Sequence, residues 1–387
     1  MENLFLESGY TSLNKKGEEL CGDKVEQVSD GENTTLVLAD GLGSGVKANI
    51  LATLTSKILC TMVSNDIGLE ECVETVVQTL PVCKVRQVAY ATFSVVHAGK
   101  DGKGMLFEFD NPEAIIIRDG KCLDPERTEY DILGKKVYCT RLALQPDDYI
   151  VVMSDGVIHA GIGMLLNFGW LRKDVKEYID ANFSKGMSAR GVACMIAGAC
   201  NDLYMGEPGD DTTVAVVRAR EYCPVRIMVG PPVERERDDY YIGQFLHGEG
   251  KKIVCGGTSS QLVAKYLGEK VSASFDFPDP DVPPIGYIKG IDLTTEGVLT
   301  LRKLVELSEK YLSTSDLDPK RSKKQDGASL LANMLFEDAT HITFFVGQSI
   351  NSAHQGLPID ITMKLKLVET IAANLRKAGK VVELNYD

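Results

Sequence analysis

The sequence predicts an α+β fold in two parts: a β-sandwich flanked by helices over residues 1–220, followed by an α/β domain over residues 221–387. Three observations support this prediction. In the first part, strand-like runs are followed by helical patterns and then by strand-like runs again. After Arg220 the composition changes to the Pro-rich, charged stretch CPVRIMVGPPVERERDDYY. Beyond this stretch, strands and helices alternate, which is typical of a partly parallel sheet.

The first part opens with strands and a pair of helices. The apolar spacing predicts strands at Leu4–Leu6, Asp23–Val28 and Thr35–Ala39, and helices at about Val46–Val63 and Leu69–Leu80. In the first helix, apolar residues recur at spacings of three and four positions, which predicts an amphipathic helix. These residues are Ile50, Leu54, Ile58 and Met62.

From Gln87 to Leu123 the pattern changes to strands separated by Gly, Asp and Asn, which favour turns. A strand pair around Val137–Leu144 and the strand Tyr149–Met153 follow. The remaining elements are helices near Lys173–Asn182 and Ala189–Tyr204 and a closing strand at Thr212–Arg218.

The second part alternates strand and helix. The strand KKIVC is followed by the turn GGTSS and the helix QLVAKYLGEKV. After GYIKGIDLT we expect a helix at Leu299–Leu312 and a polar linker at Ser313–Gly327. A helix, the strand HITFFVG, the helix Ile361–Ala378 and the strand KVVELNYD complete the chain.

Composition excludes several classes of protein. The 387 residues carry a net charge of −13, and 44% of them are hydrophobic, as in a globular protein. The sequence has no run of 18 apolar residues and no apolar leader at its start, so we expect no membrane span and no signal peptide. The basic run Lys320–Lys324 lies among acidic residues, and we interpret it as a solvated linker rather than a nucleic-acid contact.

The ten cysteines form no CxxC pair, and several lie in apolar helical patterns. They indicate reduced core residues and a cytoplasmic protein rather than a zinc site.

Three acidic motifs carry the functional prediction. TTLVLADGLGSG contains Asp40, DYIVVMSDGV contains Asp155, and GDDTTVAVVRA contains Asp210 and Asp211. Each lies at the end of a strand-like apolar run, where its carboxylate can meet those of other strands. Alone, each is more readily a turn residue than a ligand; together they form an oxygen cage suited to Mg²⁺ or Mn²⁺. Such a cage with two metals can activate water against a phosphoryl group.

Other phosphate-binding patterns do not fit. GLGSGVK lacks the spacing of a P-loop, and Val46 stands where a dinucleotide fingerprint needs glycine. Asp40 is also not followed by the Asp-x-Thr pattern of aspartyl phosphatases.

The order and wording of LADGLGSGVKA, VVMSDGVIHAG and GDDTTVAVVRA resemble the phosphatase domain of stage II sporulation protein E and its bacterial relatives. These proteins belong to the type 2C metal-dependent serine/threonine protein phosphatases. The resemblance covers roughly residues 5–220, where CGDKVEQV and FDNPEAIIIRDGK also have counterparts. It implies a type 2C phosphatase-like sandwich that hydrolyses phosphoserine or phosphothreonine in proteins without a phosphoenzyme.

The resemblance also implies roles for individual residues. Asp40 would bridge two Mn²⁺ or Mg²⁺ ions, with the carbonyl of Gly41 completing one of them. Asp155 and Asp210 would bind the second ion, with Asp210 preferred over Asp211 because the family uses the first acid of this motif. Asp23 would hold a metal-bound water or lie just outside the ligands.

The sequence departs from the family in several places. Animal members have a phosphate-gripping arginine ahead of the first motif, where this chain has Lys15 and Lys16. The turn Asn111-Pro112-Glu113 replaces a Gly- and Pro-rich one. His159 is a candidate general acid, or a capping or packing residue. In the family, the two helices after Asp40 act as a switch; their periodicity alone indicates only packing.

In the second part, Cys255-Gly256-Gly257-Thr258-Ser259-Ser260 can present amides and hydroxyls to an anion, or serve only as a helix cap. Ile291–Gly297 is another polar strand end, and both could line a small-molecule pocket at one sheet edge.

We therefore expect a cytoplasmic phosphatase with a regulatory or ligand-binding second domain. Its substrate would be a phosphoprotein, with an anti-anti-sigma-type protein suggested by the family. The alternative is a non-catalytic, phosphatase-like binding or scaffold protein. Whether the chain forms a homodimer, and which small ligand its second domain takes, are left open by the sequence.

Overall fold

The structure is a computed structural model that describes residues 4–79, 91–274, 282–313, 326–349 and 359–387. Within these residues the chain forms two compact units. Unit 1 extends to Glu221 and unit 2 begins at Tyr222.

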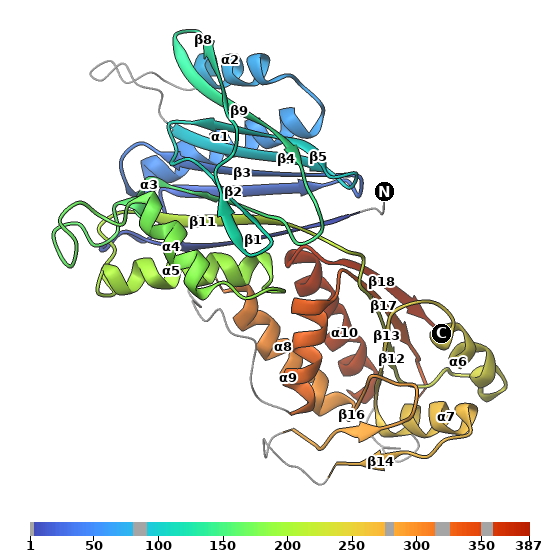
Figure 1. The fold of residues 1–387 in the computed structure, drawn as a ribbon. Coiled ribbons are helices and arrows are strands. Elements are labelled where there is room, and N and C mark those ends of the chain that lie inside the picture. The colour runs from blue at the N-terminus through green and yellow to red at the C-terminus, as the bar shows by residue number, and fades with distance from the viewer. Residues whose placement is uncertain (1–3, 80–90, 275–281, 314–325, 350–358) are drawn as a thin grey trace. The chain divides into compact units, whose positions relative to one another are not determined.

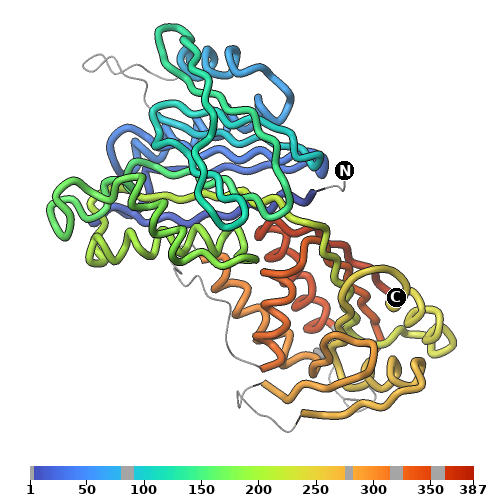
Figure 2. Tube along the Cα trace, in the orientation of Figure 1, coloured from blue at the N-terminus to red at the C-terminus, as the bar shows by residue number. Residues whose placement is uncertain are grey.

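Unit 1 contains two β-sheets (Figure 1). The first has the order β1 (Phe5–Leu13), β11 (Thr212–Arg220), β10 (Tyr149–Met153), β6 (Ile115–Arg118), β7 (Lys121–Leu123). The second has the order β2 (Asp23–Ser29), β3 (Asn33–Gly41), β4 (Ala91–Gly99), β5 (Lys103–Phe109), β9 (Lys135–Ala143), β8 (Thr128–Ile132). Figure 2 shows the N-terminal strand running beside the much later β11, with which it pairs antiparallel.

The sheets pack face to face with helices on both outer surfaces. Leu36, Leu106 and Ile150 belong to the core between the sheets. On the outer face of the first sheet lie α4 (Arg172–Asn182) and α5 (Ala189–Leu203), and on that of the second lie α1 (Gly45–Ser64) and α2 (Leu69–Thr79). The predicted sandwich with outer helices is therefore confirmed.

Only part of the apolar row of α1 packs against the core, where Ile58 and Met62 are partly buried. Ile50 and Leu54 are 52% and 47% exposed, whereas Ala48, Ala52 and Leu59 are buried. The reason is the closeness of the helix to the sheet: a Cβ on Gly41 of β3 would lie 2.1 Å from the carbonyl oxygen of Ala48. At this close approach the helix meets β3 through the small residues Ala48 and Ala52, while Leu59 packs further along the helix.

By length and composition alone, α1 could cross a membrane, with a mean hydropathy of 1.3 over 18 residues. The core helix of a soluble protein passes the same test, and 44% of this window is buried against unit 1.

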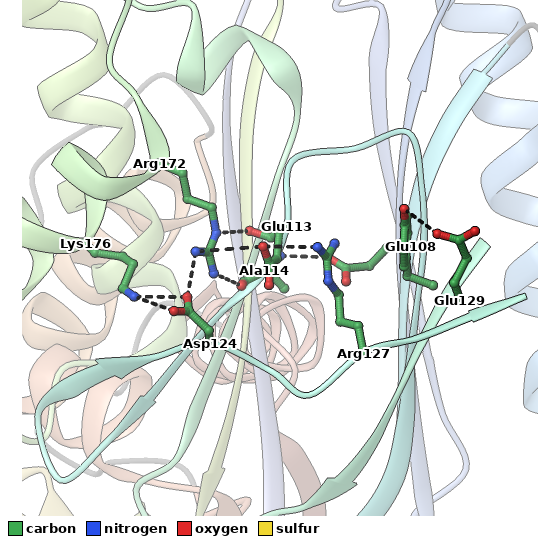
Figure 3. A network of polar contacts seen from close by, with 9 residues as sticks. Glu108, Glu113, Ala114, Asp124, Arg127, Glu129, Arg172 and Lys176 are labelled. Atoms are coloured by element: carbon green, nitrogen blue, oxygen red, sulfur yellow. Dashed lines mark hydrogen bonds and ion pairs between the residues drawn. The ribbon is translucent and has the colours of Figure 1, made fainter. Parts of the chain in front are cut away.

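A network of polar contacts fixes the turn between β5 and β6 (Figure 3). The guanidinium of Arg172, at the start of α4, donates to the carbonyl oxygens of Glu113 (2.8 Å) and Ala114 (2.7 Å). It also donates to Asp124 Oδ1 at 2.6 Å, which Lys176 contacts as well. One arginine thus ties the turn both to a helix and to the segment after β7.

Unit 2 is built on a seven-stranded, mostly parallel sheet. Its order is β14 (Ser272–Ala273), β15 (Gly286–Tyr287), β16 (Leu293–Thr295), β13 (Lys251–Cys255), β12 (Pro224–Val229), β17 (His341–Val346), β18 (Val381–Tyr386). The five strands from β16 to β18 in this order are parallel to their neighbours.

Helices cover both faces of this sheet (Figure 1). One face packs against α6 (Asp238–Leu246) and α7 (Gly257–Leu267). The other packs against α8 (Val298–Leu312), α9 (Gly327–Ala332) with its continuation as a π-helix at Asn333–Asp338, and α10 (Ile359–Lys377). The predicted α/β class is confirmed.

The sequence prediction missed two elements of unit 2. We interpreted CPVRIMVGPPVERERDDYY as a boundary, yet it contains the central strand β12 and, after a 3₁₀ turn at Arg235–Arg237, the start of α6. Flanking prolines and charges concealed a short strand whose Ile227 and Met228 are both buried, one on each face of the sheet. Lys320–Lys324 lies outside the described residues.

We predict that Gly9→Ala destabilises unit 1 by about 1–3 kcal/mol, because the added Cβ would lie 2.4 Å from the backbone nitrogen of Arg190 in α5. Trp170, the single tryptophan, is buried in unit 1, so its fluorescence during urea unfolding reports on this unit. The control is Gly68→Ala, whose Cβ would meet no atom within 4 Å; it should cost less than about 1 kcal/mol. Equal stability of the two variants would contradict the close packing of α5 on β1.

Arg172→Ala should destabilise unit 1 by about 1–3 kcal/mol, because two backbone carbonyls lose their charged donor. Arg172→Lys should recover only part of this loss, since an ammonium group cannot reproduce the several N–H donors of the planar guanidinium. The matched control is Lys176→Ala, which removes a contact with the exposed Asp124 and should cost less than about 1 kcal/mol. The same urea titration measures all three, and full rescue by lysine would show that charge alone matters.

Candidate metal centre

Two strands of one sheet and the end of a strand of the other bring three aspartates together. Asp23 on β2 pairs directly with Asp40 on β3. From the other sheet, β10 ends just before Ser154, and Asp155 begins the short helix α3 (Asp155–Ile158). The hydroxyl of Ser154 donates to Asp23 Oδ2 at 2.7 Å, so the two sheets are joined at this edge.

The Asp210-Asp211 pair reaches the same edge from β11. Asp211 is 4% exposed, and its Oδ1 accepts a hydrogen bond of 3.0 Å from the backbone nitrogen of Lys15. Asp210 is more exposed and forms an ion pair of 3.3 Å with Lys15 Nζ. The structure thus gathers all the predicted acidic residues at one edge, where the two sheets meet.

Burial and mutual repulsion disfavour the charged forms of these carboxyls. Burial, followed by repulsion from Asp23, Asp155 and Asp210, raises the pKa of Asp40 to about 9. Burial also raises the pKa of Asp23 to about 7, although hydrogen bonds from Ser154 and Thr213 oppose the change. The pKa of Asp155 is raised too, mainly by burial, with His159 acting in the opposite direction.

Two buried oxygens in the cluster are left without partners. Asp23 Oδ1 and Asp211 Oδ2 have no hydrogen-bond partner within the described part of the chain. Among the same residues, no three acidic, histidine or cysteine side chains stand close enough to grip a metal ion as they are placed. The donor set, however, consists of hard carboxylate oxygens in excess of their hydrogen-bond donors, and such a set suits Mg²⁺ or Mn²⁺.

The glycine after each Asp is required by packing. A Cβ on Gly41 would collide with Ala48, as described above, and a Cβ on Gly156 would lie 2.1 Å from the carbonyl oxygen of Asp211. The two Asp-Gly pairs therefore hold their carboxylates on backbone that is pressed against a helix or a neighbouring strand. This reason is independent of any role of the Gly41 carbonyl as a ligand.

Other residues singled out in the sequence divide between the cluster and its surroundings. Lys15 lies at the cluster, whereas Lys16 forms an ion pair of 2.7 Å with Glu207. His159 Nδ1 is 3.8 Å from Asp155 Oδ2, and both side chains are about half exposed. Glu113 belongs to the network around Arg172 rather than to the cluster.

Sequence reasoning missed the role of Ser154. Besides donating to Asp23, its hydroxyl accepts from the backbone nitrogen of Thr213 at 2.9 Å, which links β10, β11 and β2 through one side chain. Its place directly before Asp155 was the available signal. Thr92 lies on β4, where it pairs with Asp40 of β3, and its hydroxyl donates to Asn111. Polar side chains therefore continue along this edge of the sheet.

The first part of the chain matches a known protein family. The family model described as Stage II sporulation protein E matches residues 30–220. No curated protein matches the sequence.

Among solved structures, the phosphatase domain and a regulatory fragment of SpoIIE from Bacillus subtilis are 19% identical with a TM-score of 0.49. That match covers 58% of this chain and 66% of the SpoIIE chain. The RsbU and RsbW domains of a Mycobacterium tuberculosis protein are 17% identical, with a TM-score of 0.45, over 63% and 68% of the two chains. RsbX in complex with magnesium is 19% identical, with a TM-score of 0.41, over 57% and 100%.

At these TM-scores the similarity to solved structures does not indicate a function. The family assignment rests instead on the family match and on the arrangement of residues. The ordered Asp-Gly motifs, the sandwich with outer helices and the matched segment agree. Residues 30–220 form a domain of the stage II sporulation protein E family.

Proposed function

We propose that unit 1 is a divalent-metal-dependent phosphatase that hydrolyses phosphoserine or phosphothreonine in a protein. One observation carries the proposal: aspartates from both sheets crowd together at one edge, with buried oxygens that lack partners. Like charges at this density need cations to offset them. A scaffold protein that binds no metal would gain nothing from this repulsion. The crowded carboxylates therefore favour an enzyme over a non-catalytic binding protein.

Five residues would hold two Mn²⁺ or Mg²⁺ ions. Asp40 stands centrally, since Asp23, Asp155 and Asp210 all act on its charge, and this suits a bridging role. The Gly41 carbonyl would assist at one ion, Asp155 and Asp210 at the other, and Asp23 would hold a water or lie just outside. When bound, the ions would lower the pKa of a water molecule and offset the charge of the phosphoryl oxygens.

Neighbouring groups orient these ligands. Ser154 fixes Asp23, and the backbone of Thr213 fixes Ser154, so Asp23 keeps one free oxygen. Lys15 neutralises Asp210 while its backbone nitrogen holds Asp211. Asp211 is therefore the anchored member of the pair, and Asp210 is the one free to bind an ion when Lys15 swings away.

In this proposal the protein acts in the cytoplasm on a phosphoprotein, such as an anti-anti-sigma-type regulator. Unit 2 would regulate this activity. The sequence family supports a protein substrate. The composition, with its reduced cysteines and net charge of −13, supports the compartment.

We expect the wild-type protein to hydrolyse a phosphoserine peptide only with Mn²⁺ or Mg²⁺, and Asp40→Asn to reduce kcat by at least about a hundredfold, because a bridging carboxylate becomes a neutral amide. Release of phosphate measures this. Asp119→Asn is the matched control, because this aspartate lies in a surface turn with φ 50°, which asparagine also adopts. Metal-independent turnover, or full activity of Asp40→Asn, would contradict the proposal. Absence of both turnover and metal binding would favour the scaffold.

Asp210→Asn and Asp211→Asn should have different effects. Asp210→Asn should weaken Mn²⁺ binding by at least about tenfold with little change in stability, because it removes a half-exposed ligand. Asp211→Asn should leave Mn²⁺ binding nearly unchanged, because the amide oxygen of asparagine can still accept from the backbone nitrogen of Lys15. Electron paramagnetic resonance of free Mn²⁺ gives the affinity, and urea unfolding gives the stability. If Asp211→Asn has the larger effect on affinity, the assignment of the second acid must be reversed.

A further inference from the structure

In unit 2, the turns after β13 and β16 meet at the carboxyl edge of the parallel sheet. The strands are neighbours, and the backbone nitrogen of Gly256 donates to the carbonyl oxygen of Thr295 at 2.9 Å. A Cβ on Gly297 would lie 3.5 Å from the Cα of Gly256. The two turns are therefore in direct contact through their glycines.

A helix begins at each of these glycines. Gly256 precedes α7 and Gly297 precedes α8, and neither residue has a side chain to cap the helix. Glu296 Oε2 accepts from the backbone nitrogen of Leu299 at 3.1 Å, which serves one amide of α8. The sequence of the GGTSS turn is compatible with a helix cap as well as with an anion site. In the structure, Ser260 Oγ donates to the carbonyl oxygen of Gly256 and does not cap the amides of α7.

Each helix also carries a buried hydroxyl without a partner at its third position. Ser259 in α7 and Thr300 in α8 are 1% and 0% exposed. Neither hydroxyl oxygen has a hydrogen-bond partner among the residues that the structure describes. Ser259 Oγ lies 3.6 Å from the place of a Cβ on Gly256, so it points back toward the start of the helix. Unused hydroxyls at this depth are costly unless a ligand uses them.

The helices approach this point from opposite faces of the sheet, as Figure 1 shows. Their N-terminal ends, each with a partial positive charge, therefore converge from two sides. No atom lies within 4 Å of a Cβ placed on Gly257, and Ser259 Oγ is the nearest to one on Gly256. The glycines leave room for a group to approach the amides of α7.

We propose that these two turns bind the phosphate group of a small phosphorylated molecule. Amides and hydroxyls are hydrogen-bond donors, and the two helix ends favour an anion. A tetrahedral phosphate can accept from donors on two sides at once, whereas the oxygens of a carboxylate lie in one plane. The turns at Gly256 and Gly297 thus form a phosphate site that is separate from the aspartate cluster of unit 1.

The test uses the whole chain in EDTA, so that unit 1 holds no divalent ion and the outcome is independent of phosphatase activity. Isothermal titration calorimetry is run with inorganic phosphate, AMP, ribose 5-phosphate and acetate. We expect saturable binding of a phosphorylated probe and none of acetate. The best probe tells whether the source is the free ion or an organic phosphate.

Two variants and a control locate the binding. Ser259→Ala should weaken it roughly tenfold, because a hydroxyl donor to a charged group is lost. Gly257→Asp should abolish it by repulsion while keeping or raising the melting temperature, since a carboxylate suits a helix N-terminus. Ser272→Ala, on the exposed edge strand β14, should bind as wild type does.

Failure of all three phosphorylated probes to bind would overturn the proposal. So would binding that both Ser259→Ala and Gly257→Asp retain, or acetate binding as tight as that of phosphate. Loss of binding in Gly257→Asp together with an unchanged melting temperature would support it, because a purely structural role for the turn predicts the opposite pattern.

Discussion

The arrangement of unit 1 depends on the repulsion among buried carboxylates where its two sheets meet. Asp23, Asp40 and Asp155 belong to two strands and a helix, yet burial together with repulsion from Asp23 and Asp155 raises the pKa of Asp40. A fold that selected only for stability would separate such groups or replace one with a neutral residue. Their convergence, together with the unpartnered oxygens of Asp23 and Asp211, makes a cation the natural counterpart of this edge.

Close backbone packing keeps these charges in place. The helix after Asp40 lies so near β3 that only glycine fits at position 41, and Gly156 is held equally closely by the backbone of Asp211. Ser154 then connects β10 to β2 and β11 by hydrogen bonds. Repulsion alone would spread the carboxylates, and this rigid frame opposes it. If the proposed metal site is correct, this frame would keep the carboxylates near one another before an ion binds.

The two proposed sites would bind charge in opposite ways. Unit 1 concentrates negative side chains at the ends of antiparallel strands, which suits metal ions. Unit 2 directs the positive ends of two helices to the carboxyl edge of a parallel sheet, which suits an anion. The difference lies in the residues at these strand ends, which are aspartates in unit 1 and the glycines Gly256 and Gly297 in unit 2.

The sequence by itself determined the two-part architecture, most of the strands and helices, and the acidic residues of the cluster. Short motifs such as Ser154-Asp155-Gly156 indicate these features, because the order of neighbouring residues is enough to recognise them. It could not determine which face of α1 is buried, because the packing distance at Gly41 is set by the partner sheet. It also could not show that β12 is the central strand of unit 2, since prolines and charges flank it. Tertiary structure alone decided that Lys15 stands against Asp210 and that Gly256 and Gly297 touch, because such contacts join residues distant in the chain.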